Sequence, residues 1–356
     1  MGATITQEAT TGTRWRWVAL GAGGVAAGIW LLAWLLARRG FDWVEFLSTL
    51  AVLEWWWLVA AGGAVMAGYW GRALRWRVLI RPVKPEPSLW NLFSATVIGF
   101  SAITLFGRPG EVVRPYLIAS KEKVSASSQV AALVLERIYD ILMVLAIFGF
   151  ALGRVRRSDA RLGPALSWVF STGGWFVAVL SVALLGLLVV FRHFSAPMRR
   201  RILDALSFLP KHHFERADRL ITAFVQGMES VKDWKAMLAV VGYTALEWAT
   251  IALTVFCVMR AFGRSLHFGW LDVLIFLGFL AFGAVVQIPG VGGGTQVVSV
   301  LILTELFRMP LEVSTSVALV IWIMSFVVVV PIGVALALRE GLRWRTWKQW
   351  EPEAGL

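Results

Sequence analysis

The chain has 356 residues, of which 58% are hydrophobic and 16% are charged, and its formal net charge is +12. Its apolar residues come in runs too long for the helices of a soluble core, which excludes a soluble globular protein. The positive charge does not indicate nucleic-acid binding. The Lys and Arg lie in connecting loops, where positive-inside topology and anionic head groups account for them.

Crossing a bilayer as a helix takes about 20 apolar residues, and several runs here have that length. The sequence therefore predicts an all-α, polytopic helical membrane protein with about 7–8 transmembrane helices, two of whose segments are interrupted or re-entrant. We expect residues 1–356 to form a single membrane domain, multi-pass in the cytoplasmic (inner) membrane. The candidate spans lie near residues 18–37, 52–70, 130–151, 165–191, 236–259, 271–288 and 313–338.

The segment 89–120 is predicted to be a re-entrant hairpin, which enters and leaves the membrane on one side. Lys and Arg concentrate in cytoplasmic loops. Here they accumulate in the expected loop after the second span, which includes Arg72 and Arg75, and again in residues 192–235. An ordinary crossing between these loops would place the second one outside, whereas a hairpin keeps both inside. Arginines within 154–161 would then face outward, against the same rule.

Charged residues gather after this hairpin's first leg, at Arg108, Glu111 and Arg114. Inserting an ionisable side chain into the hydrocarbon layer costs roughly 2.5–3.5 kcal/mol of free energy per group, unless the group is paired or hydrated. The next span carries Glu136 and Asp140 one helical turn apart, and two like charges so placed repel each other. The two arginines have the right sign to pair with them, and an arginine holds a carboxylate by two parallel hydrogen bonds.

Two interpretations of this charged group stay open. In one, the charges lock the hairpin to the span that follows it. In the other, one or both arginines keep a donor free for a phosphate group, while Gly110 lets backbone approach the ligand and a short helix N-terminus adds its dipole. Glu247, alone in its span, is expected to face the same interior, either as a proton carrier or as an arginine partner.

Residues 289–308 are predicted to form a glycine-rich broken helix, because Pro289 is followed by a run rich in Gly. Each Gly inside a helix lowers the stability of that helix by up to about 1 kcal/mol relative to Ala. Broken backbone at membrane depth is tolerated only where it is buried in protein or lines a wet cavity. Two interrupted segments, one in each half of a chain, point to a midplane binding site in transporters. The glycines either permit close packing or contact a head group through free backbone amides.

The remaining segments carry weaker signals. Residues 194–235 are predicted to be an amphipathic cytoplasmic linker of two interfacial helices, either a plain connector or a surface for a partner, and 339–356 a short tail. No cofactor or metal is expected. Cys257 is the single cysteine, and the glycine run lacks the Gly-Lys-Ser/Thr ending of a nucleotide-binding loop.

Three features in order carry a resemblance to a known family. They are the motif Gly107-Arg108-x-Gly110-Glu111-x-x-Arg114, the pair Glu136-Arg137 with Asp140, and the glycine-rich break at Pro289-Gly290. Together they resemble the transmembrane domain family of lysylphosphatidylglycerol synthase, also called the flippase-like domain family, from the second span onward.

The resemblance implies a bacterial or archaeal inner-membrane protein that moves lipids between leaflets. Larger members carry a soluble aminoacyl-transferase domain after the membrane part. That domain is not expected here, because the stretch after Arg339 is too short to fold into an enzyme. Gln296 stands where the family commonly has a glutamate, so a role for an ionised group at that position does not carry over.

The leading hypothesis is a lipid translocator that moves a phospholipid or lipid-linked head group between leaflets through a buried Arg/carboxylate cleft. Its expected partners are membrane lipids with an anionic or phosphate-bearing head group, and a second copy or another protein at 194–235. The alternatives are a membrane-embedded transferase acting on a lipid-linked substrate, with Glu111 or Asp140 as base, and a non-transporting membrane partner protein. An enzyme is the less favoured of these classes, and no catalytic residue is assigned. The candidate substrate-binding residues are Arg108, Gly110, Glu111, Arg114, Glu136, Arg137, Asp140, Glu247, Gly290, Gly292, Gly293 and Gln296.

Overall fold

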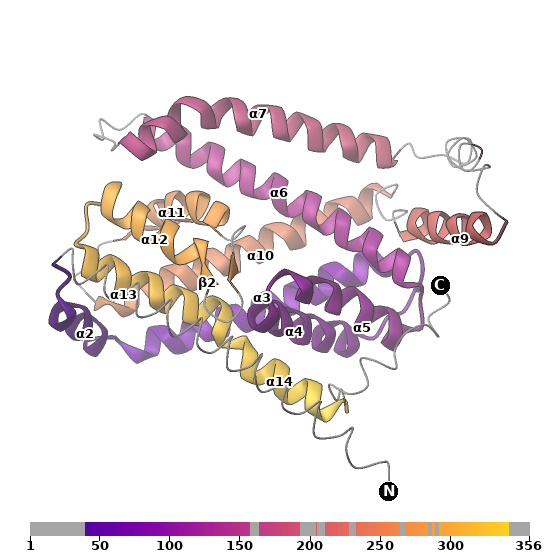
Figure 1. Cartoon of the computed structure of the whole chain (residues 1–356), viewed down its shortest axis with the longest axis horizontal. Coiled ribbons are helices and arrows are strands. Elements are labelled where there is room, and N and C mark those ends of the chain that lie inside the picture. The colour runs from indigo at the N-terminus through magenta and orange to yellow at the C-terminus, as the bar shows by residue number, and fades with distance from the viewer. Residues whose placement is uncertain are drawn as a thin grey trace, which may run out of the picture.

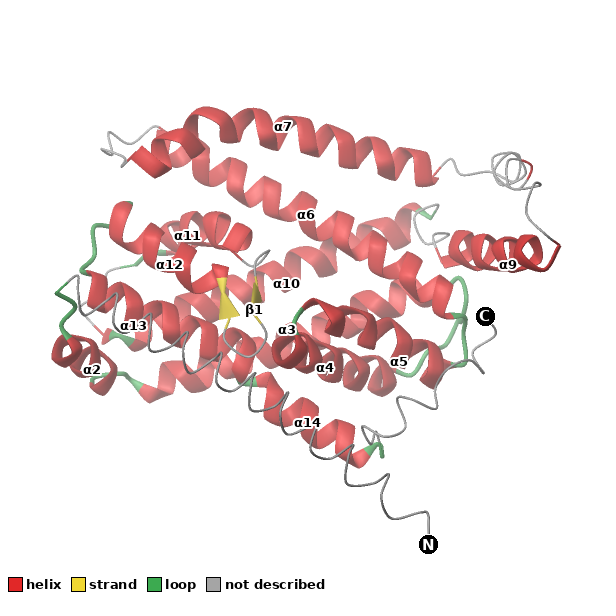
Figure 2. Cartoon of the chain, viewed as in Figure 1, coloured by secondary structure: helices red, strands yellow, loops and turns green. Residues whose placement is uncertain are grey.

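The structure, a computed structural model, describes residues 40–156, 164–192, 204, 211–227, 233–263, 268–283, 287–288 and 292–341. Within these ranges the chain is helical apart from one pair of two-residue strands (Figures 1 and 2). This confirms the predicted fold class, an all-α polytopic membrane protein. The first expected span, 18–37, lies outside the described residues.

The elements follow one another as helices of very different length. In chain order they are α2 (Trp43–Ala51), α3 (Trp55–Ile80), α4 (Leu89–Phe106), the 3₁₀ helix η1 (Arg108–Val112), α5 (Val113–Glu122), α6 (Ala126–Arg156), α7 (Pro164–Arg192), α9 (Lys211–Gly227), α10 (Trp234–Ala261), α11 (Trp270–Gly283), β1 (Gln287–Ile288), β2 (Gly292–Gly293), α12 (Gly294–Glu305), α13 (Leu311–Trp322), the π-helix η4 (Ile323–Val327) and α14 (Val329–Arg339).

Four stretches of the described chain are both long enough and apolar enough to cross a membrane, Leu89–Phe106, Thr172–Arg192, Trp234–Ala261 and Leu311–Arg339. A fifth span results if α2 and α3, which meet at 78°, count as one bent crossing. The short helices α11 and α12 have 14 and 12 residues. They are therefore roughly 21 and 18 Å long, against a hydrocarbon layer of about 30 Å. The helix predicted over 271–288 thus ends early, at Gly283.

Helix α3 corrects the predicted boundary of the second span. The span expected over 52–70 runs on to Ile80, so Arg72 and Arg75 lie in the helix and their assignment to a loop was wrong. The chain offers no helix-breaking residue before Pro82, and the residue preceding a proline is where helices tend to stop. Along its length α3 packs against α10, and Gly68 allows this close approach, since a Cβ there would lie 2.9 Å from Thr250 Oγ1.

Helices α4 and α5 form an antiparallel hairpin around η1. Gly107 ends α4 with a φ of 73°, a left-handed conformation that favours glycine. The open ends of the two legs are joined by Asn91 Nδ2, which donates to Glu122 Oε1 (2.8 Å), and by the ion pair of Lys84 with Glu122 (3.0 Å). Residues 89–120 therefore turn back on themselves, and their entry and exit on one side of a membrane stays a prediction.

The glycine-rich segment forms the second break in the helical path. Strands β1 and β2 pair antiparallel, with Gln287 opposite Gly293, and α12 starts directly after them and packs against α11. The predicted interruption therefore falls where the glycines are. Residues 289–291, which include Gly290, lie outside the described part of the chain.

The core that surrounds the charged residues is formed by α3, α4, α5, α6 and α10. Its buried side chains include Trp76, Leu92, Ile118, Leu135 and Val240. A second core lies among α6, α10, α11, α12 and α13. These two clusters hold the helices that supply the polar interior.

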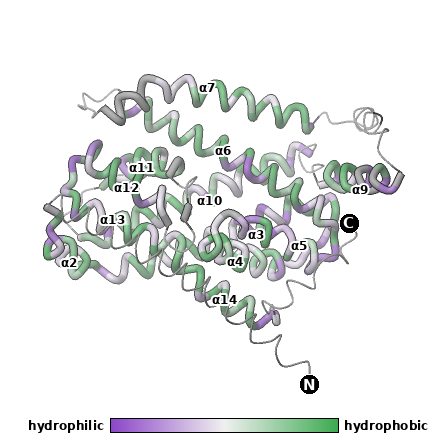
Figure 3. The backbone as a smooth tube through the Cα atoms, viewed as in Figure 1, coloured by the Kyte–Doolittle hydropathy of each residue, from purple (hydrophilic) through white to green (hydrophobic). Residues whose placement is uncertain are grey.

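Two outer helices complete the arrangement in Figure 1. Helix α7 lies along α6, its residues are mostly hydrophobic (Figure 3), and between Thr172 and Arg192 only Gly173 is buried, as expected of a lipid-facing helix. Helix α9 lies within the linker predicted over 194–235. It is held to α6 by a hydrogen bond from Ser127 Oγ to the Leu220 carbonyl (2.8 Å).

Candidate functional site

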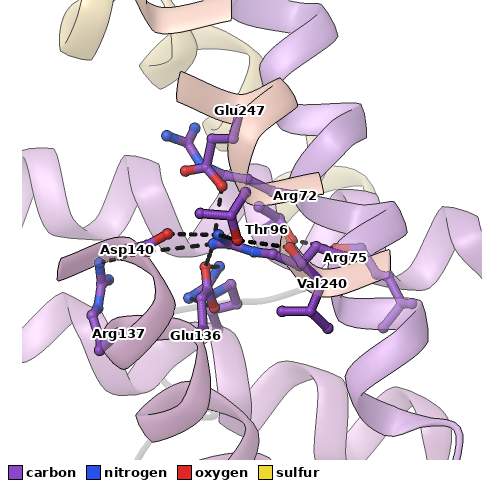
Figure 4. Close-up of polar contacts among 11 residues, drawn as sticks. Arg72, Arg75, Thr96, Glu136, Arg137, Asp140, Val240 and Glu247 are labelled. Atoms are coloured by element: carbon purple, nitrogen blue, oxygen red, sulfur yellow. Dashed lines mark hydrogen bonds and ion pairs between the residues drawn. The ribbon is translucent and has the colours of Figure 1, made fainter. Parts of the chain in front are cut away.

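Arg75 is the centre of the polar interior. Its side chain is 1% exposed, and it projects from α3 towards α6 and α10 (Figure 4). Its Nη1 donates to Asp140 Oδ1 (2.6 Å) and to Thr244 Oγ1 (3.0 Å), and its Nη2 donates to Glu136 Oε1. The same Nη2 lies 2.9 Å from Glu247 Oε2. One guanidinium thus faces three carboxylates from two helices.

Arg114 holds the other side of Glu136. Its Nη1 donates to Glu136 Oε1 (3.0 Å) and its Nη2 donates to Oε2 (2.6 Å), which is the bidentate geometry expected of an arginine and a carboxylate. The guanidinium lies over the Trp76 ring, 4.2 Å from its centroid, a favourable cation–π arrangement. Trp76 is itself fixed by donating from Nε1 to Gln129 (3.1 Å).

Arg72 completes the group one turn before Arg75. Its Nε donates to Glu247 Oε1 (2.7 Å), and its guanidinium lies 4.4 Å from the centroid of the Phe100 ring. The six residues joined in this way are called the Arg75 network below. They are Arg72, Arg75, Arg114, Glu136, Asp140 and Glu247.

The Arg75 network is electrically balanced, with three arginines and three carboxylates. Buried charges lose several kcal/mol of hydration each, and good geometry is needed to recover it. Here the equal numbers of positive and negative charges and the multiple hydrogen bonds compensate for the lost hydration. Even so, Arg75 Nε is buried and has no hydrogen-bond partner among the described residues.

One edge of the network that is open to its surroundings lies on α6, and Arg72 on α3 is exposed to a similar extent (14%). Asp140 is 13% exposed and also lies 3.7 Å from Arg137 Nη1, whose side chain is 41% exposed. Arg137 is thus the half-exposed cation at this edge, and with it the charge of the group becomes +1. A ligand that reaches the Arg75 network from this side meets Arg137 first.

Of the candidate residues predicted from the sequence, Arg114, Glu136, Asp140 and Glu247 are brought together, with Arg137 at their edge. The hairpin tip is arranged differently from our prediction. Gly110 is buried against the backbone of α4, where a Cβ would lie 2.5 Å from the carbonyl carbon of Ala102. What approaches Gly110 closely is therefore the neighbouring helix. The backbone of Arg108 lies in η1, its side chain lies outside the described part, and Glu111 is partly exposed beside it.

The glycine-rich candidates lie in the second break. Gly292 and Gly293 form β2, and the Gln296 side chain accepts a hydrogen bond from the Gly293 amide (2.6 Å). Such a contact satisfies one of the backbone donors left over at a helix start. Gln296 therefore caps the first turn of α12.

The residues that sequence reasoning missed are Arg72 and Arg75. Positive-inside reasoning gives arginines near a span end to a loop, which hid their role. A signal was present. Both arginines lie in a continuous helical stretch before the first proline, and their spacing of three places them on one face of it.

Comparison with known proteins supports one assignment. No curated protein matches the chain. A sequence profile of the family described as lysylphosphatidylglycerol synthase TM region matches residues 20–333, which include every member of the Arg75 network. The match spans the α4–α5 hairpin, the glycine-rich break and the helices between them, so the chain belongs to the lysylphosphatidylglycerol synthase transmembrane region family.

Proposed function

We propose that the protein is a lipid translocator, which moves a phospholipid or a lipid-linked head group between the leaflets of the cytoplasmic membrane. The observation that carries this proposal is the burial of the Arg75 network within a membrane protein of this family. Replacing buried ion pairs by apolar side chains of similar size is often neutral or stabilising. Six charged residues at this depth are therefore better explained by what they bind than by stability.

The network supplies what a head group loses when it leaves water. Guanidinium groups bind phosphate oxygens as they bind carboxylates, through parallel hydrogen bonds. A phosphate that enters past Arg137 can take the place of Asp140 at Arg75, while Asp140 keeps Arg137 as its partner. The +1 charge of the network with Arg137 matches the single negative charge of a phosphodiester. The unpartnered Nε of Arg75 is a further donor for it.

A second candidate function is favoured by the closure of the network. Arg114 and Glu136 satisfy each other by two hydrogen bonds and are 3% and 1% exposed. A closed pair of this kind locks α5 to α6, as a non-transporting membrane partner protein would need. The two functions differ in what happens to lipid when the charges are removed.

The deciding experiment measures the passage of fluorescent phospholipid between leaflets of reconstituted vesicles. In a translocator, Arg114→Ala lowers the flux to that of protein-free vesicles, while Arg339→Ala, at an exposed helix end, leaves it unchanged. Arg137→Gln is the companion variant because its half-exposed side chain can be changed without opening the core. We expect it to lower the flux at least several-fold with an unchanged unfolding temperature. Wild-type vesicles no faster than protein-free ones, or Arg137→Gln at full flux, would favour the non-transporting function.

A further inference from the structure

A second polar site lies on the opposite face of α3. Arg77 follows Arg75 by two residues, which is about 200° around a helix, so the two side chains leave in nearly opposite directions. Arg75 points into the network and Arg77 points outward. Arg81 follows Arg77 by four residues and lies on the same face. The two guanidinium groups are thus neighbours at the end of α3.

These arginines line a surface pocket of about 490 Å³ together with Pro85 and Glu86, and the four residues are called the Arg77 pocket. Arg77 Nε is buried and has no hydrogen-bond partner in the part of the chain that the structure describes. A buried donor without an acceptor costs about 1–3 kcal/mol. The nearby Lys84 is already engaged, since it pairs with the Glu122 carboxylate (3.0 Å) and donates to the Glu122 carbonyl (2.9 Å). The pocket is therefore lined by two arginines, one of which keeps a donor without a partner among the described residues.

Tryptophans place the Arg77 pocket at the level of lipid head groups. Trp70 lies seven residues before Arg77 on the same face of α3, is 41% exposed and stacks on Phe93 at 4.3 Å, and Trp90 beside it is 50% exposed. Exposed Trp side chains are typical of the membrane–water interface. Arg77 lies about 10 Å further along the helix axis. The head-group region is about 5–8 Å thick on each side, so a step of this length places Arg77 at its outer, water-facing boundary.

The charges of the pocket are bipolar. Arg77 and Arg81 suit a phosphate, which they can bind through parallel hydrogen bonds. Glu86, which also lines the pocket, suits an ammonium that can donate hydrogen bonds. We propose that the Arg77 pocket binds the phosphoethanolamine head group of a membrane phospholipid, with the phosphate on the two arginines and the ammonium on Glu86. This site faces away from the Arg75 network and does not depend on translocation.

The test is the affinity of the purified full-length chain for single phospholipids, measured by native mass spectrometry in a nonionic detergent. The probes are phosphatidylethanolamine, phosphatidylcholine and phosphatidylglycerol with the same acyl chains. The phosphate alone does not distinguish them. A charge-assisted hydrogen bond contributes about 1.5–3 kcal/mol, so we expect the ethanolamine lipid to bind about tenfold or more tightly than the other two.

Variants of the pocket residues then show which side chains cause the preference for phosphatidylethanolamine. Arg77→Gln with Arg81→Gln lowers the affinity for all three lipids, Glu86→Gln removes only the preference for ethanolamine, and the control pair Arg154→Gln with Arg339→Gln changes neither. Each variant is first checked for an unchanged unfolding temperature. Equal affinity of the wild type for the three lipids, or an unchanged preference in Glu86→Gln, overturns the proposal.

Competition separates the lipid from a soluble phosphate. Glycerophosphoethanolamine, which carries the head group without acyl chains, is expected to displace the lipid only at a much higher concentration, because it lacks the chains that lie beside Trp70 and Trp90. Inorganic phosphate is expected to be weaker still. Displacement by inorganic phosphate at concentrations equal to the lipid would identify a free-phosphate site and overturn the assignment to a phospholipid.

Discussion

Glu136 is the residue that joins the two halves of the Arg75 network. One of its oxygens accepts from both Arg75 and Arg114, and the other accepts from Arg114 alone. Removing one partner of a buried charge pair typically costs about 3–5 kcal/mol, because the remaining charge is left without compensation. The network should therefore tolerate the loss of a pair better than the loss of one charge.

A double-mutant cycle tests this at the residue scale. Glu136→Ala and Arg114→Ala should each destabilise the protein by about 3–5 kcal/mol. The double variant should lose less free energy of unfolding than the two single variants together, because it removes one positive and one negative charge at once. The measurement is the free energy of unfolding in mixed detergent micelles. Additive losses would show that the two side chains do not share their stabilisation.

Part of the Arg75 network could be predicted from the sequence. The repulsion of Glu136 and Asp140 on one helical face required a cation, and Arg114 is brought to Glu136. The cation that contacts both carboxylates, Arg75, was assigned to a loop. Its burial depends on Glu247, which is far away in the chain and meets Arg75 only because α3 packs against α10. Local charge counting contains no information about that packing.

At the scale of elements, the α4–α5 hairpin depends on two glycines. Gly99 and Gly110 let the legs approach so closely that a Cβ on Gly99 would lie 2.6 Å from the Arg114 Cβ. The spacing of the legs therefore sets the position of the Arg114 guanidinium. Packing in the hairpin and geometry in the network are coupled through this one contact.

Gly99→Ala tests the coupling. The added methyl group must push α5 away from α4, and overpacking of this kind costs about 1–3 kcal/mol. We expect a lower unfolding temperature and, in a translocator, reduced lipid flux. The matched control is Gly63→Ala on α3, where an added Cβ meets nothing within 4 Å. That variant should be neutral or slightly stabilising, because Ala is favoured over Gly within a helix. A Gly99→Ala protein as stable as the control would contradict the coupling.

Elements were predictable where the signal was local. The hairpin turn and the glycine-rich break both follow from Pro and Gly at fixed positions, and both interruptions occur there. Helix ends were less predictable. Helix α3 continues well past the expected end of its span because its polar last turns are buried against other helices, which hydropathy along the chain does not record.

At the scale of the whole molecule, the two ends of the α4–α5 hairpin differ in character. Lys84 and Glu122 pair at its open end, and its tip carries exposed apolar side chains, Leu105, Phe106 and Val112. Helix α4 is about 27 Å long, close to the thickness of the hydrocarbon layer of about 30 Å. Exposed apolar side chains at the tip, beside the partly exposed Glu111, and a polar base suit a segment that enters and leaves on one side.

Cysteine labelling in sealed vesicles tests this orientation. In a Cys257→Ser background, Glu86→Cys and Ser125→Cys flank the hairpin, and Arg154→Cys lies at the other end of α6. We expect a membrane-impermeant maleimide to label the first two from one side and Arg154→Cys from the other, because α6 is roughly 46 Å long and is long enough to cross. Labelling of the first two positions from different sides would contradict the hairpin.

The π-helix η4 has a consequence for movement. The hydroxyls of Ser101 and Thr104 donate to carbonyls of α4 itself (2.8 and 3.1 Å), and each also lies within hydrogen-bond distance of a carbonyl at the irregular turn between α13 and α14, those of Val329 (3.2 Å) and Phe326 (3.4 Å). Separating α4 from α14 would strand these acceptors in an apolar layer. In a translocator we therefore expect the two helices to move as one rigid body, so that a gap admitting a lipid opens on the opposite flank of the hairpin, where charged side chains can exchange partners.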